Sequence, residues 1–247
     1  MRRFGLIGKT LKHSFSGKYF NEKYKKEQIS DCQYDLFELP TIEEFPKLVA
    51  SLRPQLAGFN VTIPYKKEVM TYLDELDSIA ERIGAVNVIK AEDNGNLKGY
   101  NSDYFGFRLS IEPWLTNKNL KALVLGTGGA SSSVKTTLED LGIDFSFVSR
   151  KPLSNGFTYD EIKSKPEILA EHQLVINSSP VGTFPDVDQK PDLPYGQLTS
   201  QHFLFDLVYN PEETAFLKEG KLAGASTKNG GDMLVLQAEK SWEIWNA

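Results

Sequence analysis

The sequence predicts an α/β protein made of two domains. Three observations support this fold class: short apolar runs alternate with segments of helical period, the alternation restarts near residue 100, and a glycine-rich turn follows the first strand after the restart. Alternating strands and helices are typical of βαβ units with parallel strands. The length of 247 residues suits one large domain or two modest ones.

The first half of the chain contains a series of predicted strands, which we expect to form a parallel sheet. The strands are 4–7, 34–38, 58–62 and 85–91, and the predicted helices are 19–26, 41–52, 66–70 and 78–83. Thr41 and Glu44 have the spacing of a capping box, so we expect the Thr41 side chain to cap the helix that follows.

A second α/β unit is predicted over residues 104–231. Its strands are 121–125, 145–148, 174–177 and 203–208, and a helix of small residues is expected over 130–141. Residues 164–171 and 185–194 are the loosest stretches. The Asp- and Pro-rich segment 185–194 is expected to lie on the surface.

The composition excludes several classes of protein. With 28 Lys and Arg against 33 Asp and Glu, the net charge is −5, so no basic surplus exists for binding a nucleic-acid backbone. Hydrophobic residues make up 40% of the chain, which is enough for a folded core. No apolar run approaches a membrane span and no signal-peptide pattern is present, so we expect a cytoplasmic protein.

Cysteine and histidine usage argues against metal or disulfide chemistry. Cys32 is the single cysteine, so no internal disulfide or cysteine-rich zinc site is expected. Its surroundings contain no basic neighbour that would activate a thiolate, and we interpret it as a bystander. His13, His172 and His202 lack the spacing of metal ligands. We therefore expect no bound metal.

A glycine-rich turn, Gly126-Thr127-Gly128-Gly129-Ala130, follows a predicted strand and opens a helix. Glycine permits positive φ and lets a pyrophosphate approach the backbone. The helix N-terminus then offers N–H donors and a positive dipole end to the anion. Taken alone, the glycine cluster fits a plain tight turn equally well.

The end of the next strand indicates which dinucleotide binds. Sites for NAD carry Asp or Glu about 20 residues past the glycines, where the carboxylate accepts a hydrogen bond from the ribose 2′-hydroxyl. Ser149, Arg150 and Lys151 stand there instead. Arg binds a 2′-phosphate that a carboxylate would repel, so the sequence predicts NADP rather than NAD. The alternative is a pair of solvated surface charges.

Two short segments of the first domain form a candidate substrate site. In an extended chain residues i and i+2 face the same way, so Ser14 and Ser16 in His13-Ser14-Phe15-Ser16 are expected to offer two hydroxyls to one carboxylate. Lys66 follows Pro64 at a strand end and is a candidate acid/base, because shielding lowers the pKa of an ammonium group. An ordinary polar loop and a solvated lysine at a helix start are the alternatives.

Asn87, Asn101 and Asp103 lie at predicted strand ends or at the junction of the two units. Ligands bind at such places in α/β proteins. Each residue also fits an Asx turn or a helix cap, and Asp103 in particular fits the N-cap of the next helix.

Taken together, eight motifs in order along the chain resemble the shikimate dehydrogenase family. They are His13-Ser14-Phe15-Ser16, Asn60-Val61-Thr62-Ile63-Pro64-Tyr65-Lys66, Gly84-Ala85-Val86-Asn87, Gly99-Tyr100-Asn101-Ser102-Asp103, Gly126-Thr127-Gly128-Gly129-Ala130, Asn177-Ser178-Ser179-Pro180-Val181-Gly182, Asp206-Leu207-Val208-Tyr209-Asn210-Pro211 and Met233-Leu234-Val235-Leu236-Gln237.

The resemblance implies two α/β domains with a cleft between them, the second a Rossmann-like dinucleotide-binding domain. The substrate-binding catalytic domain is then 1–103 plus 232–247, because the family's last helix returns to it, and 233–245 should pack there. The NADP-binding domain is 104–231.

The resemblance also implies roles for individual residues. Lys66 and Asp103 would be the catalytic pair, and Ser14 and Ser16 would bind the substrate carboxylate. Residues expected to hold the ring hydroxyls or to lie near the substrate are Thr62, Asn87, Asn101, Gln237 and Tyr209. Residues expected to bind the cofactor are Gly126, Thr127, Gly128, Gly129, Ala130, Ser149, Arg150, Lys151, Leu207 and Gly230.

The activity implied by the resemblance is reversible reduction of 3-dehydroshikimate to shikimate with NADPH, a step of chorismate and aromatic amino acid biosynthesis. The partners would be this small-molecule substrate and NADP, without nucleic acid or membrane, in a monomer or homodimer. Three alternatives remain open: a quinate/shikimate dehydrogenase with relaxed substrate or NAD use, a catalytically inactive ligand sensor of the same fold, and another NADP-dependent enzyme such as a methylene-tetrahydrofolate dehydrogenase.

Several positions depart from the family pattern. Gly17 and Phe20 replace the usual Pro and His near the carboxylate loop, which puts the rigidity of that loop in doubt. Asp232 adds a negative charge near the expected nicotinamide position, where it either weakens cofactor binding or caps the final helix. Ser131, Ser132 and Ser133 stand where alanines are commoner.

Overall fold

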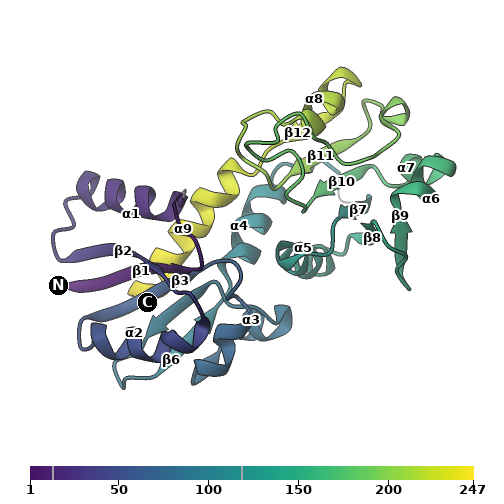
Figure 1. The fold of residues 1–247 in the computed structure, drawn as a ribbon. Coiled ribbons are helices and arrows are strands. Elements are labelled where there is room, and N and C mark those ends of the chain that lie inside the picture. The colour runs from purple at the N-terminus through teal and green to yellow at the C-terminus, as the bar shows by residue number, and fades with distance from the viewer. Residues whose placement is uncertain (13, 118) are drawn as a thin grey trace. The chain divides into compact units, whose positions relative to one another are not determined.

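The structure is a computed structural model that describes residues 1–12, 14–117 and 119–247. It divides into two compact units, one formed by Met1–Phe105 with Gln237–Ala247 and the other by Gly106–Leu236. The chain leaves and re-enters the first unit within helices α4 (Ser102–Ile111) and α9 (Gly231–Asn246) (Figure 1). The boundaries expected at 103/104 and 231/232 fall within the same two helices.

The sheet of the first unit is mixed, with the strand order β2-β1-β3-β5-β6-β4. Strands β1, β2 and β3 are parallel, whereas β5 runs antiparallel to both β3 and β6. The strand bounds are β1 Arg2–Gly8, β2 Cys32–Glu38, β3 Leu56–Val61, β4 Glu75–Leu76, β5 Val88–Ala91 and β6 Leu97–Tyr100.

The parallel pairing expected for this unit is confirmed for β1, β2 and β3, and it is wrong for β5 with its neighbours β3 and β6. β5 and β6 form a hairpin, closed by backbone hydrogen bonds from Glu92 N to Asn96 O and from Gly95 N to Glu92 O. Gly95 has φ +89°, which the turn requires. Asn-Gly between two strands is a strong hairpin signal, and it was available at residues 94–95 of the sequence.

Alternation along β1 sends side chains into two separate cores. Phe4 and Leu6 pack with α1 (Phe15–Lys26) and α9, whereas Ile7 packs on the other face with α2 (Phe45–Leu52) and the 3₁₀ helix η2 (Glu68–Tyr72). Helix α3 (Ser78–Ile83) has the bounds that the sequence predicted and adds Ala80 to the second core. Figure 1 shows α1 and α2 on opposite faces of the sheet.

The expected capping box at Thr41 does not form. The segment begins with a 3₁₀ turn, η1 (Ile42–Glu44), and Thr41 makes no side-chain cap hydrogen bond. The N–H of Glu44 donates instead to the carbonyl oxygen of Thr41, so the backbone already satisfies the donor that the hydroxyl was expected to cap.

The departure at Phe20 is part of the aromatic core. Phe20 is fully buried and stacks on Tyr34 at a ring-centroid distance of 4.6 Å, with Trp245 at 5.3 Å. Trp245 also donates from Nε1 to the carbonyl oxygen of Ile89 at 3.0 Å. The end of α9 thus packs on the first unit, as expected, but Met233 at its start packs in a core of the second unit.

The sheet of the second unit has the order β12-β11-β10-β7-β8-β9, and every neighbouring pair is parallel. This is the doubly wound order of dinucleotide-binding folds, and it reverses between β7 and β10. The strand bounds are β7 Lys121–Leu125, β8 Asp144–Ser149, β9 Gly156–Thr158, β10 Leu174–Asn177, β11 Phe203–Asp206 and β12 Ser226–Lys228.

Helices cover both faces of the second sheet. On one face α4 and α5 (Gly129–Asp140) pack through Phe107, Val134 and Leu138. The other face carries α6 (Tyr159–Ser164), α7 (Glu167–Glu171), α8 (Ala215–Leu222) and the 3₁₀ helix η3 (Tyr195–Gln197).

Two segments expected to be loose are more ordered than predicted. Residues 164–171 contain helix α7, which is fixed to the core by the buried Ile168 and Leu169. The segment 185–194 is mostly exposed over 185–190, as expected, but Leu193 is buried. Among the described residues, no helix is both long and apolar enough to cross a membrane.

Candidate active site

Lys66 and Asp103 form an ion pair in the first unit. Nζ of Lys66 donates to Oδ2 of Asp103 at 2.7 Å, and the two side chains are 24% and 9% exposed. The alternative interpretation, a solvated lysine, is therefore wrong. The ammonium group of Lys66 is partly shielded from solvent and has Asp103 as a fixed partner. A lysine and a carboxylate at this distance can pass a proton to an adjacent oxygen and orient it.

The turn after β3 sets the position of Lys66. Tyr65 is buried, its N–H donates to the carbonyl oxygen of Thr62 at 3.0 Å, and its hydroxyl donates to the carbonyl oxygen of Leu39. The carbonyl oxygen of Lys66 accepts from the N–H of Val86 at 2.7 Å. The helix predicted at 66–70 is a turn followed by η2, so Lys66 precedes the helix instead of starting it.

The start of α4 sets the position of Asp103. Oδ1 of Asn101 accepts from the N–H of Tyr104 at 3.2 Å, and Nδ2 of Asn101 donates to the carbonyl oxygen of Ala85 at 2.9 Å. Asn101 therefore caps the helix, and the interpretation of Asp103 as the N-cap is wrong. Asp103 lies in the first turn, where the helix dipole stabilises its negative charge.

Asn87 and Gln237 lie in the same unit as the ion pair. Nδ2 of Asn87 donates to Oγ of Ser102 at 3.1 Å, and its Oδ1 accepts from the N–H of Ser102 at 2.6 Å. Gln237 is half-buried on α9, and Thr62 is half-buried directly after β3. Their roles toward a ligand stay predictions.

The serine loop differs from the extended segment that the sequence predicted. Ser14 is extended and caps α1, accepting from the N–H of Gly17 at 3.5 Å, but Phe15 and Ser16 already belong to the helix. The i, i+2 argument for a shared direction of the two hydroxyls therefore fails, because it holds only for extended backbone. His13, which was part of the predicted loop, lies outside the described residues.

Gly17 lets α1 pack closely on β2. A Cβ atom at this position would lie 3.1 Å from the Leu36 side chain. Nδ2 of Asn21 donates to the carbonyl oxygen of Gly17 at 2.7 Å. The first turn of α1 is thus held by helix contacts in place of the usual proline.

The glycine turn after β7 has the properties of an anion site. Gly126 has φ +101°, and a Cβ at Gly128 or Gly129 would meet no atom within 4 Å. Within the described chain, the first turn of α5 contains no acidic residue and no side-chain cap. Open space beside a helix N-terminus, at the point where the strand order reverses, suits a pyrophosphate.

Thr127 lies in the same turn, and Ala130 lies in the first turn of α5. The serines that follow it serve the helix: Oγ of Ser131 donates to the carbonyl oxygen of Gly128, and Ser133 is buried.

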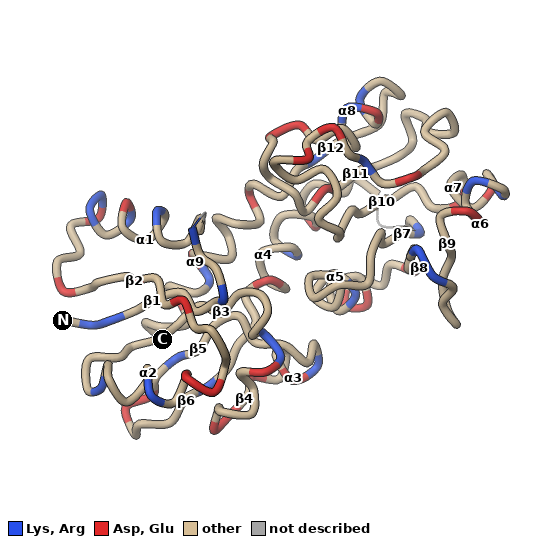
Figure 2. The backbone as a smooth tube through the Cα atoms, in the orientation of Figure 1, with Lys and Arg blue, Asp and Glu red and all other residues tan. Residues whose placement is uncertain are grey.

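The basic segment after β8 is exposed and unpaired within the described residues. Arg150 and Lys151 form no ion pair there, and Figure 2 shows the basic stretch where the chain leaves β8. Oγ of Ser149 accepts from the N–H of Lys151 at 3.1 Å, which turns the chain at the strand end. Burial raises the pKa of Tyr159, and the positive charge of Arg150 opposes that rise.

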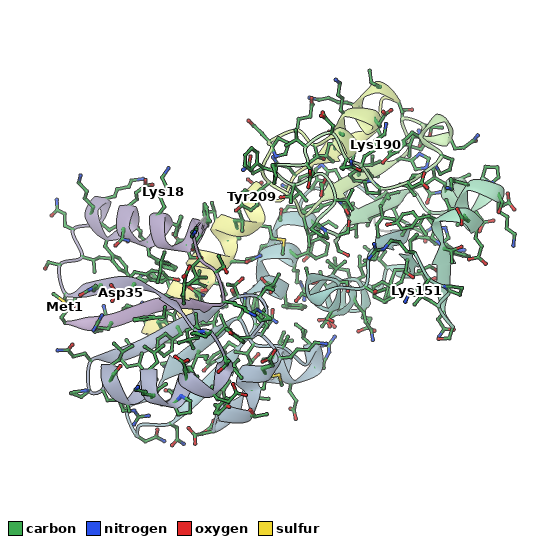
Figure 3. All side chains as sticks on the ribbon, viewed as in Figure 1. Met1, Lys18, Asp35, Lys151, Lys190 and Tyr209 are labelled. Atoms are coloured by element: carbon green, nitrogen blue, oxygen red, sulfur yellow. The ribbon has the colours of Figure 1, made fainter. Side chains whose placement is uncertain are left out.

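A second loop of this unit brings the predicted nicotinamide contacts together. A Cβ at Gly230 would lie 2.3 Å from the carbonyl oxygen of Leu207, so only glycine permits this approach of the two backbones. Tyr209 follows Leu207 and is 41% exposed (Figure 3). Asp232 is the negative charge that the sequence predicts near the nicotinamide. Its Oδ2 lies 2.9 Å from Nζ of Lys228, and this ion pair offsets the charge.

Asp206 is a buried carboxylate. It belongs to one of the eight motifs but was not among the predicted site residues. It accepts hydrogen bonds from the Thr214 hydroxyl at 2.6 Å, from Asn177 Nδ2 at 2.9 Å and from the Val208 N–H at 3.0 Å. Burial raises the pKa of Asp206 to about 6, although these hydrogen bonds favour the ionised form. The carboxylate ties the Leu207–Tyr209 loop to β10.

Comparison with known proteins identifies the family. Residues 6–89 match the model of the shikimate dehydrogenase substrate binding domain. A shikimate dehydrogenase (NADP(+)) of Clostridium beijerinckii is 43% identical over 255 residues, which cover 99% of this chain and 92% of the relative. The chain belongs to the shikimate dehydrogenase family. Membership sets aside the methylene-tetrahydrofolate dehydrogenase alternative.

Solved structures of the shikimate dehydrogenase family have the same fold. The chorismate mutase/shikimate 5-dehydrogenase fusion protein of Clostridium acetobutylicum superposes with a TM-score of 0.88 at 35% identity, covering 100% of this chain and 91% of that one. Shikimate 5-dehydrogenase of Listeria monocytogenes, in complex with shikimate and NAD, gives 0.88 at 27% identity, covering 100% and 92%. These likenesses confirm the predicted α/β fold with a Rossmann-like unit.

Proposed function

We propose that the protein is an NADP-dependent shikimate dehydrogenase that reversibly reduces 3-dehydroshikimate to shikimate in aromatic amino acid biosynthesis. The observation that carries this proposal is the ion pair between Lys66 and Asp103, with 2.7 Å between Nζ and Oδ2. Lys66 lies within the segment that matches the family's substrate binding domain. A cytoplasmic location and a monomeric or homodimeric state remain predictions.

The ion pair supplies acid/base catalysis in this proposal. During reduction, the Lys66 ammonium gives a proton to the ring carbonyl oxygen as negative charge develops there, and in the oxidation direction its amine accepts the proton of the hydroxyl. Asp103 orients both the ammonium and the substrate hydroxyl. NADPH, when bound, supplies the hydride.

The remaining first-unit residues bind the substrate in this proposal. Ser14 and Ser16 take the carboxylate, and Tyr209 of the second unit lies near the substrate. Residues assigned to the ring hydroxyls are Thr62, Asn87, Asn101 and Gln237.

The second unit binds the cofactor in this proposal. The N-terminus of α5 holds the pyrophosphate, and the basic segment after β8 holds the 2′-phosphate. Leu207 and Gly230 contribute backbone groups near the nicotinamide. Residues assigned to the pyrophosphate and the 2′-phosphate are Gly126, Thr127, Gly128, Gly129, Ala130, Ser149, Arg150 and Lys151.

Arg150→Ala is expected to weaken NADP⁺ binding about 10- to 100-fold and NAD⁺ binding much less. The reason is that charge-assisted hydrogen bonds to the 2′-phosphate are lost, each worth roughly 1.5–3 kcal/mol. Titration calorimetry with each cofactor measures the difference, and Lys218→Ala serves as the control because Lys218 is an exposed cation of the same unit. Equal losses for NADP⁺ and NAD⁺ would contradict the role of Arg150.

Initial rates of reduced cofactor formation test the proposed function. Shikimate and quinate are each assayed with NADP⁺ and with NAD⁺, and turnover is expected only for shikimate with NADP⁺. Turnover with quinate or NAD⁺ favours the relaxed quinate/shikimate dehydrogenase. Absence of turnover in all four combinations, from protein shown to be folded, favours the inactive sensor and overturns the proposal.

A further inference from the structure

A chain of buried hydrogen bonds lies within the first unit, with Ser241 of α9 at its centre. Ser241 is 1% exposed. Its Oγ donates to the carbonyl oxygen of Gln237 at 2.8 Å and accepts from Nδ2 of Asn60 at 2.9 Å. Oγ of Ser102 lies 3.3 Å from Oγ of Ser241. Since the single hydroxyl hydrogen of Ser241 is directed at Gln237, Ser102 is the donor of that contact.

One branch of the network leads to Asn87. The Ser102 hydroxyl accepts from Asn87 Nδ2 at 3.1 Å, and the Ser102 N–H donates to Asn87 Oδ1 at 2.6 Å. The next residue along α4 is Asp103, the partner of Lys66. This branch therefore fixes the Asn87 amide against the start of α4, whereas Asn101 independently sets the position of Asp103.

The other branch leads through Asn60 to Tyr34. Oδ1 of Asn60 accepts from the Tyr34 hydroxyl at 2.8 Å. Burial raises the pKa of Tyr34, so its hydroxyl keeps its proton and donates this hydrogen bond. The network thus connects Asn87, which lies directly before β5, with Asn60 of β3 and with the backbone of α9 at Gln237.

We propose that Ser241 is a positioning residue for the substrate: through Ser102 and Asn60 its hydroxyl holds Asn87 in a fixed place against α9, and it does not itself touch the ligand. This inference rests on the proposed function of the same unit. Removing the hydroxyl leaves the Ser102 hydroxyl and one N–H of the Asn60 amide without an acceptor in a buried site, because Nδ2 of Asn60 keeps only its 3.4 Å contact with the carbonyl oxygen of Asn87. Buried donors without a partner are costly, so both groups shift to find one. Asn87 moves with Ser102, and α9 loses a link to β3 and α4.

Ser241→Ala is expected to raise the KM for shikimate about tenfold, in the range of couplings between residues of one hydrogen-bond network. The kcat stays within about twofold, because Lys66 and Asp103 keep their ion pair. The KM for NADP⁺ stays unchanged, because the assigned cofactor residues belong to the other compact unit. General destabilisation does not produce this split between the two substrates.

The matched control is Ser110→Ala. Ser110 is also a buried helical serine, and its Oγ has no hydrogen-bond partner in the described structure. Both variants remove one serine hydroxyl at the same degree of burial, but Ser110→Ala breaks no hydrogen bond of the network. Ser110→Ala is expected to leave both KM values unchanged.

Ser102→Ala and the double variant complete the test, and Ser102→Ala gives an independent readout if Ser241→Ala does not fold. Because the two hydroxyls act through one contact, the double variant should raise the KM for shikimate by less than the product of the two single effects. Multiplicative effects, or an unchanged KM for shikimate in both single variants, would overturn the role of Ser241.

Calorimetry with shikimate alone separates this inference from the proposed function. Wild-type protein that binds no shikimate contradicts the proposed function, and the inference with it. Wild-type protein that binds shikimate, together with a Ser241→Ala variant of equal affinity, contradicts only the inference. The expected result is binding by the wild type and about tenfold weaker binding by the variant.

Discussion

Lys66→Ala is expected to lower the kcat for shikimate oxidation by about 10²–10⁴-fold, the usual contribution of general acid/base catalysis. The variant lacks the ammonium group that gives a proton to the reacting oxygen during reduction, and the amine that accepts it during oxidation. Affinity for NADP⁺ should remain nearly unchanged, because Lys66 belongs to the unit that does not contain the glycine turn. Steady-state kinetics and cofactor calorimetry on the same preparation measure both quantities.

Lys67→Ala is the matched control for this prediction. Lys67 is the adjacent lysine, it is exposed, and no ion pair joins it to the described residues. Its removal changes the net charge by the same amount and should leave kcat unchanged. The fold should tolerate Lys66→Ala, because the unpaired Asp103 still lies in the first turn of α4, where the helix dipole favours its charge. Wild-type turnover by the Lys66→Ala variant would rule out the acid/base assignment.

The second large effect concerns stability and pH at Asp206. The pKa of this buried carboxyl is about 6 in the folded protein, whereas an unfolded Asp titrates near its ordinary value of about 3.9. Between these two values the folded state binds more protons than the unfolded state, so the free energy of unfolding falls as the pH rises. The stabilising contribution is complete below the unfolded pKa and is lost as the pH passes through about 6. Its total is about 3 kcal/mol.

Urea unfolding at a series of pH values measures this contribution, as the difference between wild type and Asp206→Asn. The amide does not titrate, so the wild type should lose stability relative to the variant by roughly 1.4 kcal/mol per pH unit between the two pKa values. Asp186→Asn is the control, since Asp186 is exposed in the same unit. If the free energy of unfolding changes with pH in the same way for wild type and Asp206→Asn, or if the difference has the opposite sign, burial does not raise the pKa of Asp206.

The strands that could be predicted to the residue are those whose burial is uniform. Ala122–Leu125 of β7 and Leu174–Ile176 of β10 are continuous, buried apolar runs at the centre of a parallel sheet, and such runs are typical of strands buried on both faces. β6 was missed because Leu97–Tyr100 mixes buried and half-buried positions. Its pairing depends on the hairpin turn at Gly95 more than on its own composition.

Helix α8 was not predicted from the sequence, because it contains a glycine that disfavours a helix but is needed for its packing. Gly220 lowers the helix propensity of Ala215–Leu222, yet a Cβ at this position would lie 2.6 Å from the Leu204 side chain. The glycine is needed for the helix to approach β11. Only the folded arrangement shows that requirement, so no pattern within the segment predicts it.

Some parts of the candidate site could likewise be predicted from the sequence, and other parts could not. The glycine turn was predictable from local order, because a strand, a turn and a helix are consecutive in the chain. The pairing of Lys66 with Asp103 followed from resemblance to a family and not from spacing. The network through Asn60, Ser102 and Ser241 joins residues 181 positions apart in sequence, and each of them looks like an ordinary polar residue until the sheet and α9 bring them together.

Transfer of deuterium tests the central claim most directly. The wild-type protein is incubated with 3-dehydroshikimate and NADPH that carries deuterium at the transferable position of the nicotinamide, and the product is analysed by mass spectrometry and NMR. The account predicts shikimate with a single deuterium on the carbon that bears the new hydroxyl, and its near absence with Lys66→Ala. Folded wild-type protein that yields no shikimate, or shikimate without deuterium on that carbon, would contradict the account.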